Sequence, residues 1–143
     1  PAAEVTRAAL EGSCERALVS FRAAAAAKAR QKGMLFRSLH FQTGDCLARL
    51  GREAEAEKEF LAELEELPAS SEARVALAML YRSQGRDEPA RAALGGLVAA
   101  EKTPTAATYW TVVRTFAVVG AVDAAQVWAA RAQARFPSDR RFR

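Results

Sequence analysis

The stretch GDCLARLGREAEAEKEF, residues 44–60, decides how this chain folds. Its two glycines, Gly44 and Gly51, stand seven residues apart, and Ala56 and Phe60 follow the second one at offsets of five and nine. A phosphate-binding loop would need a preceding strand, and a lysine and a serine or threonine after the second glycine. None of these is present, so the stretch predicts a joint between two helices.

The same spacing recurs at other glycines. Gly12, Gly85 and Gly120 are each followed by alanine at offset five and by Phe, Leu or Ala at offset nine. Gly51, Gly85 and Gly120 stand 34 and 35 residues apart. A constant period of this length is typical of arrays of helix–turn–helix units.

Helical spacing of apolar residues runs through the chain, whereas alternating strand patterns are almost absent. Glycine and proline interrupt this spacing at regular intervals. We therefore expect an all-α chain of about eight helices, at residues 3–11, 14–32, 34–50, 53–67, 71–84, 87–101, 104–119 and 122–136.

These positions together resemble the tetratricopeptide repeat family. The resemblance rests on Gly44, Gly51, Ala56, Phe60 and Pro68 in one unit, on Tyr81, Gly85 and Ala90 in the next, and on Phe116, Gly120, Ala125 and Pro137 in the last. It implies one domain, an α-solenoid of antiparallel helix pairs wound into a right-handed superhelix. The implied repeats are 37–70, 71–105 and 106–139, preceded by a degenerate helix pair at 1–36 and followed by a basic tail at 140–143.

The spacing has a physical reason. A helix pair has an apolar face that one repeat cannot cover, so stacked repeats share a continuous core. We expect Gly44 and Ala56 to let two helices approach closely, and Phe60 to fill the remaining space. Gly51 is expected to end its helix in a left-handed conformation, which costs glycine nothing.

We find no set of residues that predicts catalysis, a metal or a cofactor, and the chain is therefore not expected to be an enzyme. The seven glutamates of residues 53–67 are interpreted as a solvated helix face. His40 is the only histidine and is expected to pack against the core. Cys14 and Cys46 lack metal-ligand spacing, so we expect two inert thiols inside helices.

The resemblance also suggests where a partner would bind, because the first helix of each pair lines the concave groove in this family. Helical spacing nominates Phe41, Asp45, Arg49, Val75, Met79, Arg82, Trp110 and Arg114 as the lining. The alternative is that these residues are ordinary surface and partial core. Apolar side chains mixed with arginines predict a protein or peptide partner with hydrophobic and acidic groups. Chaperone adaptors of this family hold a carboxylate tail with lysine, asparagine and arginine, but Phe41, Asp45 and Met79 stand at those places here.

Composition also bears on whether the partner is a nucleic acid or a membrane. The net charge is +4, but charges of both signs occur in blocks, which does not favour nucleic acid. No apolar run is long enough for membrane insertion. No signal peptide is recognisable, which slightly favours the cytoplasm. The chain has 34 alanines and 17 arginines, a bias that indicates a GC-rich, bacterial genome.

Both ends suggest that the sequence is a piece of a longer protein. It begins with Pro1 rather than methionine, and only SDRRFR follows Pro137. The last repeat is rich in apolar residues, so its end is expected to be uncapped. Two alternatives to a partner-binding groove follow: a homodimer through this end, or an accessory or structural domain of a larger protein, even of an enzyme.

Overall fold

A computed structural model describes residues 2–30 and 39–143, with the side chains of the first helix described over 12–27. Every regular element in these ranges is a helix, which confirms the all-α expectation. The elements are α1 (Ala2–Arg30), α2 (Leu39–Arg49), α3 (Glu53–Glu66), α4 (Ser71–Ser83), α5 (Asp87–Ala100), α6 (Ala106–Val118), α7 (Val122–Arg135) and the 3-10 turn η1 (Arg140–Phe142).

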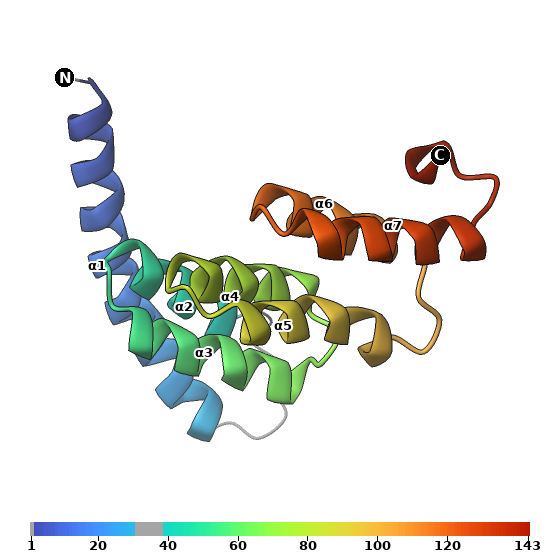
Figure 1. Ribbon diagram of the computed structural model, residues 1–143. Helices are drawn as coiled ribbons and strands as arrows, with labels where there is room; N and C mark the ends of the chain where they lie inside the picture. Colours follow the sequence, from blue (N-terminus) through green and yellow to red (C-terminus); the bar gives the residue numbers. More distant parts are fainter. Residues whose placement is uncertain (1, 31–38) are drawn as a thin grey trace. The chain divides into compact units, whose positions relative to one another are not determined.

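The helices belong to two compact units, Pro1–Glu66 and Leu67–Arg143, which we describe separately as the first and second unit. In the first unit α2 packs against α3, and α1 packs against α2. In the second unit α4 pairs with α5, α6 pairs with α7, and α5 and α6 are in contact. The pairs α2–α3, α4–α5 and α6–α7 are helical hairpins, each closed by a short turn (Figure 1).

The three turn glycines have the backbone conformation that the repeat spacing predicts. The φ angles of Gly51, Gly85 and Gly120 are 77°, 73° and 82°. At the first turn the N–H of Arg52 donates to the carbonyl oxygen of Leu47 at 2.9 Å, and the N–H of Gly51 donates to that of Ala48 at 3.0 Å. The same two bonds close the turns at Gly85 and Gly120. This pairing satisfies the last carbonyls of a helix and needs a left-handed residue, so glycine suits the position.

The predicted break at Gly12 is wrong. Residues 3–11 and 14–32 were expected to form two helices, but α1 is one helix of 29 residues, and Gly12 does not have a positive φ. Glycine also adopts the right-handed helical conformation, and the alanine-rich sequence around it favours helix. A glycine with an alanine five residues later, as at Gly12 and Ala17, therefore does not by itself end a helix. The first residues of the helix expected at 34–50 lie outside the described residues.

The C-terminal end is partly covered, contrary to the expectation of an uncapped repeat. After α7 the chain turns back, and Phe142 is 6% exposed. It joins Tyr109 and Ala132 in a small core at the end of the second unit, against which Trp110 and Phe136 also pack. The residues expected to be a solvated basic tail therefore include a buried aromatic anchor.

Candidate functional site

The eight residues nominated as groove lining fall into two sets, three on α2 in the first unit and five on α4 and α6 in the second. Phe41 is half-buried, and its ring centroid lies 5.9 Å from that of Phe60. Asp45 and Arg49 are partly exposed and pair with each other across one turn, Nε to Oδ2 at 3.1 Å. On α2, therefore, the apolar residue serves the core and the two charges satisfy each other.

On α4, Met79 is the nominated residue that is most available to a partner. Its side chain is 49% exposed, whereas Val75 is half-buried. Arg82 is committed to other contacts, because its Nε donates to the carbonyl oxygen of Val119 at 3.0 Å and its guanidinium pairs with Asp87 at 2.9 Å. Arg82 thus ties the end of α4 to the end of α6 and brings these two helix faces together.

On α6, Arg114 is exposed, and within the described ranges no residue forms an ion pair or hydrogen bond with its side chain. Trp110 is half-buried, and its ring centroid lies 6.4 Å from that of Phe142 in the tail. Val118, which the sequence reading missed, is 70% exposed. The spacing of 110, 114 and 118 could have found it, because residues four apart lie on one helix face.

The tail that contacts Trp110 through Phe142 also has polar contacts within itself. Asp139 accepts a hydrogen bond from the backbone N–H of Arg141 at 3.0 Å and pairs with the Arg141 guanidinium at 2.7 Å. These contacts lower the pKa of Asp139 to about 2.

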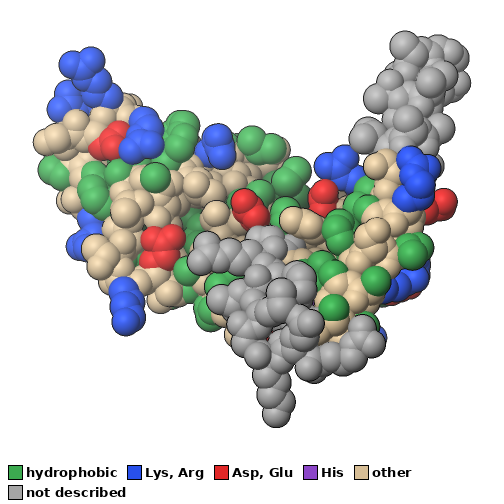
Figure 2. All heavy atoms as spheres, turned by 180° about the vertical axis from the view of Figure 1, so that it is seen from behind, with side chains coloured by type: hydrophobic (Ala, Val, Ile, Leu, Met, Phe, Trp, Pro, Cys, Tyr) green, Lys and Arg blue, Asp and Glu red, His purple; other side chains and the backbone are tan. Residues whose placement is uncertain are grey.

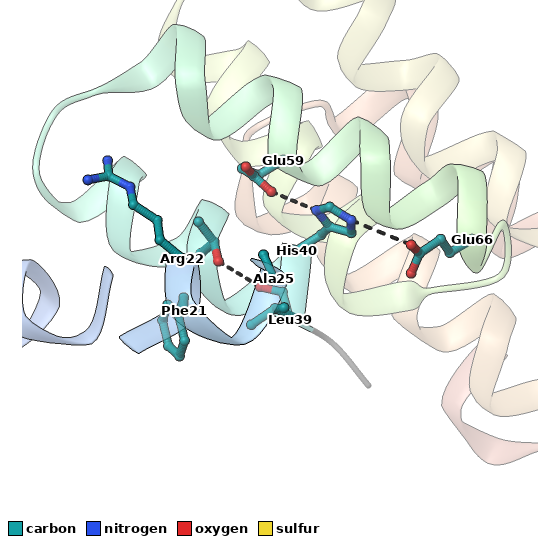
Figure 3. A pocket seen from close by; sticks show the side chains of 8 residues that line it. Phe21, Arg22, Ala25, Leu39, His40, Glu59 and Glu66 are labelled. Atoms are coloured by element: carbon teal, nitrogen blue, oxygen red, sulfur yellow. Dashed lines mark hydrogen bonds and ion pairs between the residues drawn. The ribbon is translucent and has the colours of Figure 1, made fainter. Parts of the chain in front are cut away.

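A cavity of about 370 Å³ lies in the first unit between α1, α2 and α3. Its lining is apolar on the side of Phe21, Ala25 and Leu39 and charged on the side of His40 (Figure 3). His40 Nδ1 lies 2.7 Å from Glu59 Oε2, and His40 Nε2 lies 3.5 Å from Glu66 Oε1. The histidine was expected to pack, and it does so half-buried between two carboxylates.

Both ring nitrogens of His40 face carboxylates, which orients the ring and leaves neither nitrogen directed at a nucleophile. Thr43, the hydroxyl in the cavity wall, donates to the carbonyl oxygen of Leu39 at 2.8 Å. In the described part of the chain, His, Cys, Asp and Glu side chains form no group of three suited to a metal ion. The cavity thus offers a shaped, partly charged surface and no assembled nucleophile and base.

One of the seven glutamates is not on a solvated face. Glu63 is 1% exposed, and its Oε2 accepts a hydrogen bond from the Phe41 N–H at 3.0 Å. The carboxylate satisfies a free N–H in the first turn of α2, where the helix dipole favours negative charge. Ala56, Phe60 and Glu63 are the buried residues of α3, and this i, i+4, i+7 spacing could have revealed the position.

A second, smaller cavity of about 260 Å³ lies in the second unit between α5, α6 and α7. Phe116 and Trp128 form its apolar wall, and Arg91 and Asp123 form its charged wall. The guanidinium of Arg91 binds both carboxylate oxygens of Asp123 at 3.0 and 3.1 Å. This pair raises the pKa of Arg91 and lowers the pKa of Asp123. Its charges are already matched, which gives a ligand little to neutralise.

The rest of the described surface shows no further cluster that indicates a binding site. On the face seen in Figure 2, hydrophobic side chains lie in small groups between charged and neutral ones rather than in one band. Among the helices described, none is both long and apolar enough to cross a bilayer. A scan against protein-family models matches none to this chain, and the searches of curated proteins and of solved structures find no match either.

Proposed function

We propose that this chain is a noncatalytic protein-interaction module made of tetratricopeptide-like helix pairs stacked as a solenoid. Its binding surface is the α4–α6 face of the second unit, which we define as Met79, Arg114 and Val118. The partner is a peptide or protein segment that carries hydrophobic and acidic side chains.

The observation that carries this proposal is that Arg114 has no partner in the part of the chain that the structure describes and lies beside exposed apolar side chains. It is a cation without a partner among the described residues, and Val118, one turn away, is 70% exposed. The Arg82 bond to Val119 brings α4, with its half-exposed Met79, to α6. Methionine and arginine are enriched at protein interfaces, and an exposed cation beside apolar side chains complements an acidic, apolar segment.

The test begins with a partner obtained by affinity capture and identified, after which its dissociation constant is measured against purified variants. Arg114→Glu and Met79→Asp should each raise the dissociation constant at least about tenfold, because one reverses the charge and the other places a carboxylate in the apolar contact. Arg135→Glu on α7 makes the same charge change at another exposed arginine and should have little effect. Unchanged affinity in both α4 and α6 variants would rule out this surface.

A second candidate is an oligomerisation or structural role, which the exposed valines of α7 favour. Val122 and Val127 are 59% and 51% exposed, and neither is covered by the tail residue Phe142. Light scattering over a range of concentrations separates the two candidates. A dimer that Val127→Asp dissociates would favour self-association, whereas a monomer at all concentrations would exclude it.

A further inference from the structure

The interface between α1 and α2 brings together the two cysteines of the chain. The cavity wall places Phe21 and Ala25 of α1 beside Leu39 and Thr43 of α2. Ala25 lies near the end of α1 and Leu39 is the first residue of α2, so the end of one helix lies beside the start of the other and the two run antiparallel. Seven residues are two helical turns. Two turns back along α1 from Phe21 is Cys14, and two turns forward along α2 from Leu39 is Cys46.

The side chains agree with this register. Cys14 is 6% exposed, Cys46 is half-buried, and both are free thiols. The two thiols, one from each helix, lie close enough to influence each other's titration, and this interaction contributes to the raised pKa of Cys46. Leu18, one turn after Cys14, is buried on the same face of α1 and shows that this face is the packed one.

We propose that Cys14 and Cys46 are a redox pair, and that their oxidation to an intramolecular disulfide locks α1 onto α2. The oxidant that we name is a low-molecular-weight disulfide such as glutathione disulfide. In the reduced form α1 packs against α2 without a covalent link, and a bond between the thiols makes that contact permanent until it is reduced.

The reaction proceeds by two exchanges. Cys46, the more exposed thiol, loses its proton to water and attacks one sulfur of glutathione disulfide, which forms a mixed disulfide and releases one glutathione thiolate. Cys14 then loses its proton and attacks the Cys46 sulfur, which releases the second glutathione thiolate. Both thiolates take up protons from water. Two protein thiols are oxidised to one disulfide, and one glutathione disulfide is reduced to two thiols.

The surroundings of Cys46 decide how fast this happens. Burial, with the nearby Cys14 thiol as a smaller cause, raises the pKa of Cys46 to about 12. The reactive thiolate is therefore scarce at neutral pH, and its fraction rises about tenfold with each pH unit below that pKa. The pair resists brief exposure to oxidants and responds to a sustained oxidising environment.

The test uses the full chain, reduced, freed of reductant and incubated without oxygen with glutathione disulfide at pH 7, 8 and 9. Samples are blocked with iodoacetamide and measured by intact mass and by tryptic mapping. We expect a species lighter by two hydrogens and a disulfide-linked pair of the tryptic peptides 8–16 and 38–49. Its formation should accelerate about tenfold per pH unit. Dithiothreitol should restore the reduced mass.

Two comparisons make the outcome decisive. In Cys14→Ser the mixed disulfide on Cys46 should accumulate, and no linked peptides should form. In the unmodified chain, closure of the mixed disulfide should be at least about tenfold faster in native buffer than in concentrated urea, because folding holds the sulfurs together. The locked form should melt about 5–10 °C higher than the reduced form. A stable glutathione adduct, an intermolecular dimer, or closure as slow in native buffer as in urea would each overturn the proposal.

Discussion

The ring of Phe60 lies in the space into which a Cβ at position 44 would project. The Cε1 and Cδ1 atoms of this ring would be 2.7 and 2.8 Å from that carbon, which is closer than side chains pack. Phe60 is 1% exposed, so its ring cannot swing out into solvent without losing the core of the first unit. The contact between Gly44 and Phe60 therefore sets the distance between α2 and α3.

Gly44→Val should destabilise the first unit by about 1–3 kcal/mol, because it overpacks this contact. Urea denaturation followed by circular dichroism measures the change. The double variant Gly44→Val with Phe60→Leu should lose less than the sum of the two single variants, since the smaller side chain makes room. Strictly additive effects would show that the two residues do not meet.

Gly12→Ala should stabilise the chain by about 0.5–1 kcal/mol, because Gly12 is inside α1 and alanine is the better helix former. Among the side chains that the structure describes, the new Cβ would meet Arg16 Nη1, at 3.4 Å. Gly51→Ala is the matched control and should destabilise, since φ is 77° there. A loss of stability in Gly12→Ala, measured by thermal melting, would instead indicate a turn at this position.

The effect of Gly96→Ala on the free energy of unfolding should depend on whether Arg74 is present. The guanidinium of Arg74 lies where a Cβ at position 96 would stand, and it donates to the carbonyl oxygens of Pro68 at 2.8 Å and Ala93 at 3.1 Å. In the native chain the gain in helix propensity should be offset by loss of these bonds. In an Arg74→Ala background Gly96→Ala should stabilise by about 1 kcal/mol. A double-mutant cycle in urea with zero coupling would contradict this contact.

Phe142→Ala should release the tail and expose Trp110. The expected cost to the second unit is about 1.5–3 kcal/mol, the value of burying one phenylalanine. A Trp128→Phe background leaves Trp110 as the only tryptophan, and its emission should shift to longer wavelength as water reaches the ring. Arg143→Ala, a change at an exposed neighbour, should leave the emission unchanged. An identical spectrum in both variants would mean that Phe142 does not cover Trp110.

Acid should release the tail through Asp139. Its pKa in the folded chain is about 2, below the usual 3.8, so its contacts with Arg141 stabilise the turn that presents Phe142 above about pH 4 and are lost as the pH falls toward 2. In the Trp128→Phe background, Trp110 emission followed during an acid titration should change between about pH 4 and pH 2. Asp139→Asn keeps a capping side chain without the charge, and its titration should lack that change. An equal acid transition in both chains would assign it to other carboxylates.

The turn positions could be predicted from the sequence because their cause is local. A left-handed residue after a helix is a property of a few neighbouring peptide units, so the glycines at 51, 85 and 120 and their 34- and 35-residue spacing are enough to locate them. Close packing at Gly44 was also predictable, since the large and small residues recur at fixed offsets. The same local reasoning failed at Gly12, where glycine fits a helix as well as a turn.

Contacts between residues far apart in sequence were decided only by the tertiary structure. Phe142 folds back onto Trp110, and Glu63 enters the core to meet the N–H of Phe41. Such contacts depend on which helix faces are left open once the pairs have formed, and composition does not encode this. The sequence by itself thus determined the all-α class and the turns at Gly51, Gly85 and Gly120, because helix formation and these turns are local. The tertiary structure decided which side chains are free for a partner, because exposure depends on everything that packs around them.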